Sequence, residues 1–137
     1  MLSPPDRYRL CTDQMSISAP LRPVNVSFLH ESGCRKIITI AGGFVSADVV
    51  AVLKTSRMEV VHFPLECAGH PPMFEDQATR ILQHIIECHN TGSKLHIVCG
   101  PEMIEVAVIL GLFRKIHSKW KTGAIVPECL EICRFVD

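Results

Sequence analysis

The sequence predicts an α/β fold in which helices flank a central, largely parallel sheet. Short runs rich in β-branched residues alternate with segments whose apolar residues recur at helical spacing. The connections between these segments are short, as in crossover units of a parallel sheet. The chain has 137 residues and contains no long linker or internal repeat, so we expect one domain spanning 1–137.

The first 23 residues predict an irregular lead-in. Short strands fit Tyr8–Thr12 and Met15–Ser18. Pro20 and Pro23 then end this region, because proline cannot donate a backbone hydrogen bond to a sheet.

A short helix and a central strand are expected next. Pro23 suits the opening of a helix over Val24–Glu31, and Gly33 suits its end. Lys36–Ala41 is rich in β-branched residues and is followed by the pair Gly42–Gly43. This stretch therefore predicts a strand inside the sheet.

The middle of the chain predicts a helix, a strand and a longer helix. Ser46 is a suitable N-cap for a helix over Ala47–Thr55. Met58–Phe63 predicts the next strand, and Pro64–Pro72 a loop. Apolar residues at helical spacing then predict an amphipathic helix over Glu75–His89.

The last third predicts a buried strand and two helices. Lys94–Val98 is a short apolar strand that follows a clear turn. A long apolar run predicts a helix over Glu105–His117. A final helix is expected at about Thr122–Phe135, with Pro127 in or near its first turn.

The connection between the last strand and the helix that follows it carries the most informative residues. Cys99 comes directly after Val98, and the loop continues with Gly100, Pro101, Glu102, Met103 and Ile104. A strand, a tight loop and a helix N-terminus form an anion-binding geometry, because unpaired amides converge there. An enzyme using this cradle needs a cysteine thiolate and a positive charge. The loop offers Glu102 and Glu105 instead.

Several strings along the chain are collinear with those of a known family. They are Pro4-Pro5-Asp6-Arg7-Tyr8, a divergent Ile17-Ser18-Ala19-Pro20, Asn25-Val26-Ser27-Phe28-Leu29, Cys34-Arg35-Lys36-Ile37-Ile38, the segment from Arg114-Lys115 to Trp120, and Glu128–Phe135. In this order they resemble the plant and fungal atypical dual-specificity phosphatases, over nearly the whole chain. The resemblance implies a protein-tyrosine-phosphatase-like, three-layer fold.

The chain departs from this family at the signature loop. The family pattern is His-Cys-five residues-Arg, with a glycine inside the loop. By this resemblance Val98 stands at the histidine position and Cys99 at the nucleophile position. Glu102 replaces the glycine and Glu105 replaces the arginine. Cys99 would then be a vestigial nucleophile, in a divergent member with a degenerate loop.

These replacements oppose phosphate chemistry. Arginine holds phosphoryl oxygens with a bidentate fork that no other side chain reproduces. At an effective dielectric near 20, two like charges about 4 Å apart cost about 4 kcal/mol. Both glutamates also raise the pKa of Cys99 and favour the unreactive thiol. The simplest interpretation of Cys99 is a small buried residue at a strand end.

A general acid is also required, usually an aspartate on a neighbouring loop. Glu75 and Asp76 lie near that place, just before the helical residues 78–89, and Asp76 is the candidate for this role. The interpretation that the chemistry favours is different. Glu75 and Asp76 would form an acidic first turn that complements the helix dipole.

Three functions follow from these observations. The resemblance implies first a pseudophosphatase that acts as a regulatory or scaffolding subunit through protein partners, including related phosphatase-like subunits. The second is an active phosphatase on phosphoprotein or inositol pyrophosphate substrates. The third is a sulfur-transfer module of the rhodanese type, against which the acidic loop counts, because persulfide transfer also prefers a cationic loop.

Composition restricts the partners. Fourteen Lys and Arg residues balance fourteen Asp and Glu residues, so no overall charge attracts nucleic acid or an acidic membrane. The longest apolar run is too short to span a bilayer, and the N-terminus lacks the apolar segment of a secretory signal. We therefore expect neither nucleic acid nor a membrane as a partner.

The cysteines indicate a reducing compartment. There are seven, an odd number, and most lie in apolar segments. We expect reduced thiols in the cytoplasm, with the nucleus as a second location. His84, Cys88, Cys129 and Cys133 repeat an i, i+4 spacing and leave zinc as an alternative, but no CxxC pair exists. We expect no metal and no cofactor.

Overall fold

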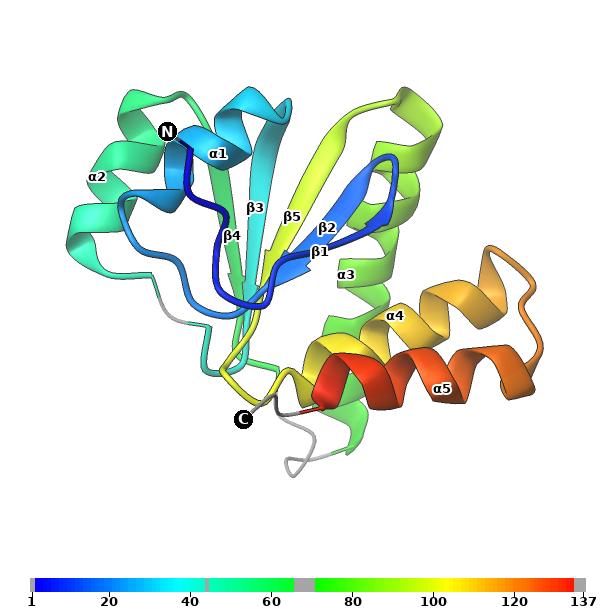
Figure 1. Cartoon of the computed structure of the whole chain (residues 1–137). Helices are drawn as coiled ribbons and strands as arrows, with labels where there is room; N and C mark the ends of the chain where they lie inside the picture. The colour runs from blue at the N-terminus through cyan, green and yellow to red at the C-terminus, as the bar shows by residue number, and fades with distance from the viewer. Residues whose placement is uncertain (1, 44, 66–70, 135–137) are drawn as a thin grey trace.

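A five-stranded sheet forms the middle layer of the computed structural model, which describes residues 2–43, 45–65 and 71–134. The strand order is β1-β2-β5-β3-β4 (Figure 1). The strands are β1 (Arg9–Thr12), β2 (Met15–Ser18), β3 (Cys34–Ile40), β4 (Glu59–Phe63) and β5 (Lys94–Val98). β1 is antiparallel to β2, and the other neighbours are parallel. The predicted, largely parallel sheet is confirmed.

Helices cover both faces of this sheet (Figure 1). One face carries α1 (Asn25–Glu31) and α2 (Ala47–Thr55), whose buried residues form one hydrophobic cluster with β3. The other face carries α3 (Pro71–Thr91), α4 (Ile104–Ile116) and α5 (Thr122–Cys133), which enclose the larger cluster. The chain therefore has the predicted three-layer α/β architecture.

Most elements lie where the sequence places them, and local chemistry explains why. The α2 helix begins after Ser46, whose Oγ accepts a hydrogen bond from the Val49 amide at 3.3 Å. Gly33 ends α1 with a φ of 94°, a conformation that favours glycine. Strand β3 then begins at Cys34, two residues before the predicted start, because the chain turns at once into the sheet.

The start of α3 differs from the prediction. The helix begins at Pro71 rather than Glu75 and ends at Thr91. The loop prediction for Pro64–Pro72 is therefore wrong at its end, where Pro71 and Pro72 occupy the first helical turn. Proline is tolerated there because the first amides of a helix have no intrahelical partner. The rest of that loop, at 66–70, lies outside the described residues.

The α5 helix differs slightly from the prediction at its C-terminus. The helix ends at Cys133, two residues before the predicted end, and 135–137 lie outside the described residues. Pro127 lies inside the helix, in its second turn.

In the described part of the chain, we find no helix that combines the length and apolarity needed to cross a bilayer.

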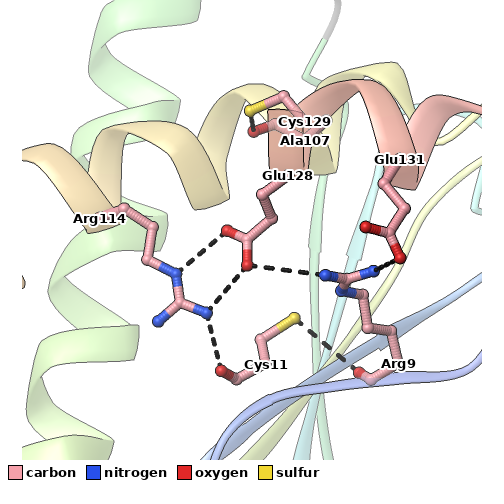
Figure 2. Close-up of polar contacts among 7 residues, drawn as sticks. All are labelled: Arg9, Cys11, Ala107, Arg114, Glu128, Cys129 and Glu131. Atoms are coloured by element: carbon pink, nitrogen blue, oxygen red, sulfur yellow. Dashed lines mark hydrogen bonds and ion pairs between the residues drawn. The ribbon is translucent and has the colours of Figure 1, made fainter. Parts of the chain in front are cut away.

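A polar cluster fixes α5 to the rest of the molecule (Figure 2). The Arg114 guanidinium contacts both carboxylate oxygens of Glu128, at 3.1 and 3.2 Å, and donates to the Cys11 carbonyl at 2.8 Å. Arg9 reaches Glu128 and Glu131 from β1. These contacts tie α4, α5 and the edge strand together, and α5 in turn lies close to the Cys99 loop.

Candidate functional site

Cys99 directly follows β5 and is buried at that end of the sheet. The Cys99 amide donates to the Ser18 carbonyl at 3.0 Å, so the parallel pairing of β5 with β2 continues one residue beyond the strand. The side chain of Cys99 is 0% exposed. The structure therefore places this residue as the sequence predicts, at a strand end and inside the core.

Two glycines after β3 allow the Cys99 backbone to approach closely. A Cβ on Gly43 would lie 2.4 Å from the Val98 carbonyl oxygen and 2.9 Å from the Cys99 Cα. A Cβ on Gly100 would lie 3.4 Å from the Cα of Gly42. In the sequence this glycine pair marks only the end of a strand, whereas in the structure it forms one wall of the site.

The loop turns into α4 through a strained residue. Met103 has a φ of 62° and serves as the N-cap of α4 without a side-chain capping bond. Its amide donates to the Gly100 carbonyl at 3.0 Å, which closes the turn. Glu102 is exposed, whereas Glu105 is half-buried in the first turn of α4. The left-handed conformation therefore turns the chain and directs Glu105 inward.

The Glu105 carboxylate faces the cysteine. The Cys99 thiol donates to Glu105 Oε2 at 3.7 Å. The pKa of Cys99 is raised to about 11, mainly by burial and in smaller part by the charge and hydrogen bond of Glu105. Backbone hydrogen bonds from Val106 and Gly100 act in the opposite direction. Two backbone amides therefore donate to the sulfur, while burial and Glu105 keep the thiol protonated at neutral pH.

Arg7 is a residue that sequence reasoning did not assign to the site. Its guanidinium donates to the Pro101 carbonyl at 3.0 Å, to the Arg134 carbonyl at 2.7 Å and to the Ile132 carbonyl. It thus ties the lead-in segment to the loop and to the end of α5. Its position in the Pro-Pro-Asp-Arg-Tyr string is the only signal in the sequence that marks it.

A buried histidine lies in β5, three residues before Cys99. His96 is 0% exposed, and its Nδ1 and Nε2 lie 2.7 and 2.8 Å from the hydroxyls of Ser16 and Ser18. Ser18 donates its only hydroxyl proton to the Ala19 carbonyl, so Nε2 carries the ring proton and Nδ1 accepts from Ser16. Burial lowers the pKa of His96 to about 3. This histidine is a neutral structural residue of β5, stacked on Tyr8.

Asp76, the candidate general acid, lies on an exposed face of α3. Its carboxylate pairs with Arg80 at 3.4 Å, and it lines a groove of about 710 Å³ with residues of β4. None of the residues that line this groove belongs to the Cys99 loop. The interpretation of Glu75 and Asp76 as an acidic first turn is wrong, because α3 begins at Pro71 and its first turn holds no acidic residue.

The four residues considered for zinc separate into two groups. Cys129 and Cys133 donate to the carbonyls of Ala107 and Met103 on the α4 side. His84 and Cys88 lie on α3, where the His84 ring accepts a hydrogen bond from the Lys36 ammonium of β3. Among the described side chains, no cluster of three or more histidine, cysteine or acidic residues is arranged to hold a metal ion.

The fold is that of known phosphatases, although no family model and no curated protein matches the sequence. The core catalytic domain of the PP-IP phosphatase SIW14 from S. cerevisiae superposes with a TM-score of 0.83, at 19% identity over 97% of this chain and 79% of that one. TpbA from P. aeruginosa gives a TM-score of 0.74, at 13% identity over 90% and 72%. A leucine-rich-repeat and phosphatase-domain protein from Entamoeba histolytica gives 0.68, at 11% identity over 95% and 81%. This likeness shows a tyrosine-phosphatase-like fold.

Proposed function

We propose that this phosphatase-fold chain is a pseudophosphatase that acts as a regulatory or scaffolding subunit through contacts with other proteins in the cytoplasm or nucleus. The observation that carries the proposal is the Cys99–Glu105 pair. The only nucleophile of the loop is fully buried, and a carboxylate lies 3.7 Å from its sulfur atom.

The chemistry of phosphoester cleavage explains why this pair matters. The reaction requires a thiolate, and with a pKa of about 11 Cys99 is almost entirely protonated at pH 7. It also requires positive charge around the phosphoryl oxygens. Residues 99–105 contain no lysine, arginine or histidine. Arg7, the nearby cation, directs its guanidinium to backbone carbonyls.

The alternative is an active phosphatase on phosphoprotein or inositol pyrophosphate substrates. The observation in its favour is that the Gly100 and Val106 amides still form hydrogen bonds to the cysteine sulfur and lower its pKa. The likeness to the PP-IP phosphatase SIW14 supports the same alternative. It predicts turnover of a phosphoester or an inositol pyrophosphate that Cys99→Ser abolishes.

Anion binding separates the two proposals. Titration calorimetry with phosphate, vanadate and an inositol polyphosphate should detect no binding to the wild-type chain. The double variant Glu102→Gly, Glu105→Arg should bind these anions, because it restores the glycine and the arginine of the loop. The pair Glu31→Arg, Glu87→Gln serves as the control, since it changes the net charge equally at exposed helix positions. Tight binding to the wild type, or turnover by it, would overturn the proposal.

A cellular test addresses the scaffolding role. In cells that lack the protein, the Cys99→Ser chain should restore function as fully as the wild type, because the role does not use the thiolate. A partner of the same fold, such as a related phosphatase-like subunit, is the first class to examine. Failure of Cys99→Ser to complement, with the variant present at normal abundance, would favour the enzyme.

A further inference from the structure

The last helix is apolar on both of its faces. Ile125 and Ile132 point into the protein and are 9% and 5% exposed. Val126 and Leu130 point the other way and are 48% and 67% exposed. A surface helix of a globular protein normally carries polar residues on its outer face. The outer face of α5 therefore has the composition of a contact surface.

The exposed apolar residues of α5 form one continuous stripe. Gly123, Val126, Pro127 and Leu130 are all exposed and recur at i, i+3, i+4 and i+7, which places them on one side of the helix. We call these four residues the α5 stripe. Figure 1 shows α5 in front of α4, with no other element over it in that view. From Thr122 to Pro127 the helix contains no charged residue.

We propose that the α5 stripe is a two-fold contact between two copies of this chain, with the two α5 helices antiparallel. The stripe is self-complementary. A Cβ built on Gly123 would meet no atom within 4 Å, so the space beside this residue is open to a larger side chain. Leu130 lies two turns further along. An antiparallel pairing centred between Val126 and Pro127 places each Leu130 over the Gly123 of the other copy, as two-fold symmetry requires.

The charges at the ends of the helix agree with this pairing. The N-terminus of α5 has no side-chain cap and no acidic residue in its first turn, and the exposed Lys119 and Lys121 precede it. Glu131, which pairs with Arg9 at 3.1 Å but keeps 67% of its side chain exposed, lies at the opposite end. Antiparallel packing brings each Glu131 to the N-terminus of the other α5, where a carboxylate complements the helix dipole. Arg134 then lies beyond the contact and points to solvent.

This symmetry favours a second copy over an unrelated protein as the occupant. Among the described residues, the other large exposed apolar side chains are scattered over several elements, and the two on α4, Ile104 and Ile116, lie at its opposite ends. One helix face makes a small interface, so the dimer should be weak and dependent on concentration. The contact does not involve the Cys99 loop, and its failure would leave the proposed function untouched.

Sedimentation velocity on the full chain tests the dimer. Between about 5 and 500 µM, a range in which small interfaces dissociate, the mass should rise from 15.3 kDa towards twice that value. Leu130→Glu and Gly123→Phe should each weaken association at least about tenfold, because the first places a charge in the contact and the second occupies the space in which Leu130 of the other copy would lie. Val24→Glu is the matched control, since Val24 is 55% exposed on the opposite face of the sheet.

A cross-linking experiment keeps the proposal falsifiable if a variant folds poorly. Benzoylphenylalanine at position 130 should cross-link to the residues around Gly123 of a second copy, and circular dichroism should show unchanged helix content in every variant. A monomer at all concentrations would overturn the proposal. So would a dimer that survives both Leu130→Glu and Gly123→Phe, or cross-links that map to another element.

Discussion

Arg114 and Glu128 form a bidentate ion pair whose side chains are only 9% and 10% exposed (Figure 2). Arg114 belongs to α4 and Glu128 to α5, and the same guanidinium also holds the Cys11 carbonyl. Because water scarcely reaches the pair, removal of one partner leaves a buried charge without compensation.

Glu128→Gln should therefore lower the free energy of unfolding by about 3 kcal/mol or more. Urea denaturation followed by circular dichroism measures this change. Asp76→Asn is the control, because the Asp76–Arg80 pair is exposed on both sides and should contribute about 0.5 kcal/mol or less. Equal effects of the two substitutions would show that the buried pair is not a major stabilising contact.

The reactivity of Cys99 should follow its burial and its acidic neighbour. Alkylation of the Cys99 peptide, followed by mass spectrometry across pH, should have a midpoint near 11 in the wild type. Glu105→Gln should move this midpoint down while leaving it above the ordinary cysteine value, because burial is the larger cause. Glu31→Gln, at the exposed end of α1, should leave it unchanged. A wild-type midpoint at an ordinary thiol value would contradict the geometry of the pair.

Stability should depend on pH through His96. The folded chain binds a proton at this residue only near pH 3, whereas the unfolded chain binds one near 6.5. The contribution of His96 is thus complete above pH 6.5 and is lost as the pH falls from 6.5 towards 3. The free energy of unfolding should fall by about 1.4 kcal/mol per pH unit in that window.

The slope of the free energy of unfolding against pH, rather than the absolute stability, tests whether His96 is the titrating group. His96→Asn should flatten the dependence between pH 6.5 and 5, even if the variant is less stable throughout. Burial also lowers the pKa of His84, but His84 is only partly buried, so His84→Gln should retain most of the slope. An unchanged slope in His96→Asn would rule out His96 as its source.

The two glycines after β3 should respond very differently to alanine. At Gly43 the new Cβ would overlap the Val98 carbonyl, and backbone must move to accept it, so Gly43→Ala should cost at least about 2 kcal/mol. At Gly42 the nearest atom lies 3.7 Å away, an ordinary contact, so Gly42→Ala should be tolerated within about 1 kcal/mol. Chemical denaturation of both variants checks the difference. Similar stabilities would mean that the loop does not pack against Val98.

The local elements could be predicted because their signals are short-range. Ser46 and the helix after it, the β-branched run of β3, and the strand Lys94–Val98 each depend on residues a few positions apart. The acidic replacements at Glu102 and Glu105 are likewise visible without coordinates. The acidic loop on which the proposed function rests can therefore be recognised in the sequence.

Other features depend on contacts between distant parts of the chain. Arg7 reaches Pro101, and His96 reaches Ser16, only because the order of the strands brings these segments together. The start of α3 at Pro71 was missed because two prolines suggest a loop as readily as a first helical turn.

The sequence by itself determined the α/β class, the strand–loop–helix around Cys99 and the acidic character of that loop, because propensity, turn chemistry and residue identity are local. Only the tertiary structure decided that Glu105 turns towards the sulfur of Cys99. It also decided that the outer face of α5 is left apolar and uncovered. These features depend on the packing of segments far apart in the chain, which no local pattern encodes.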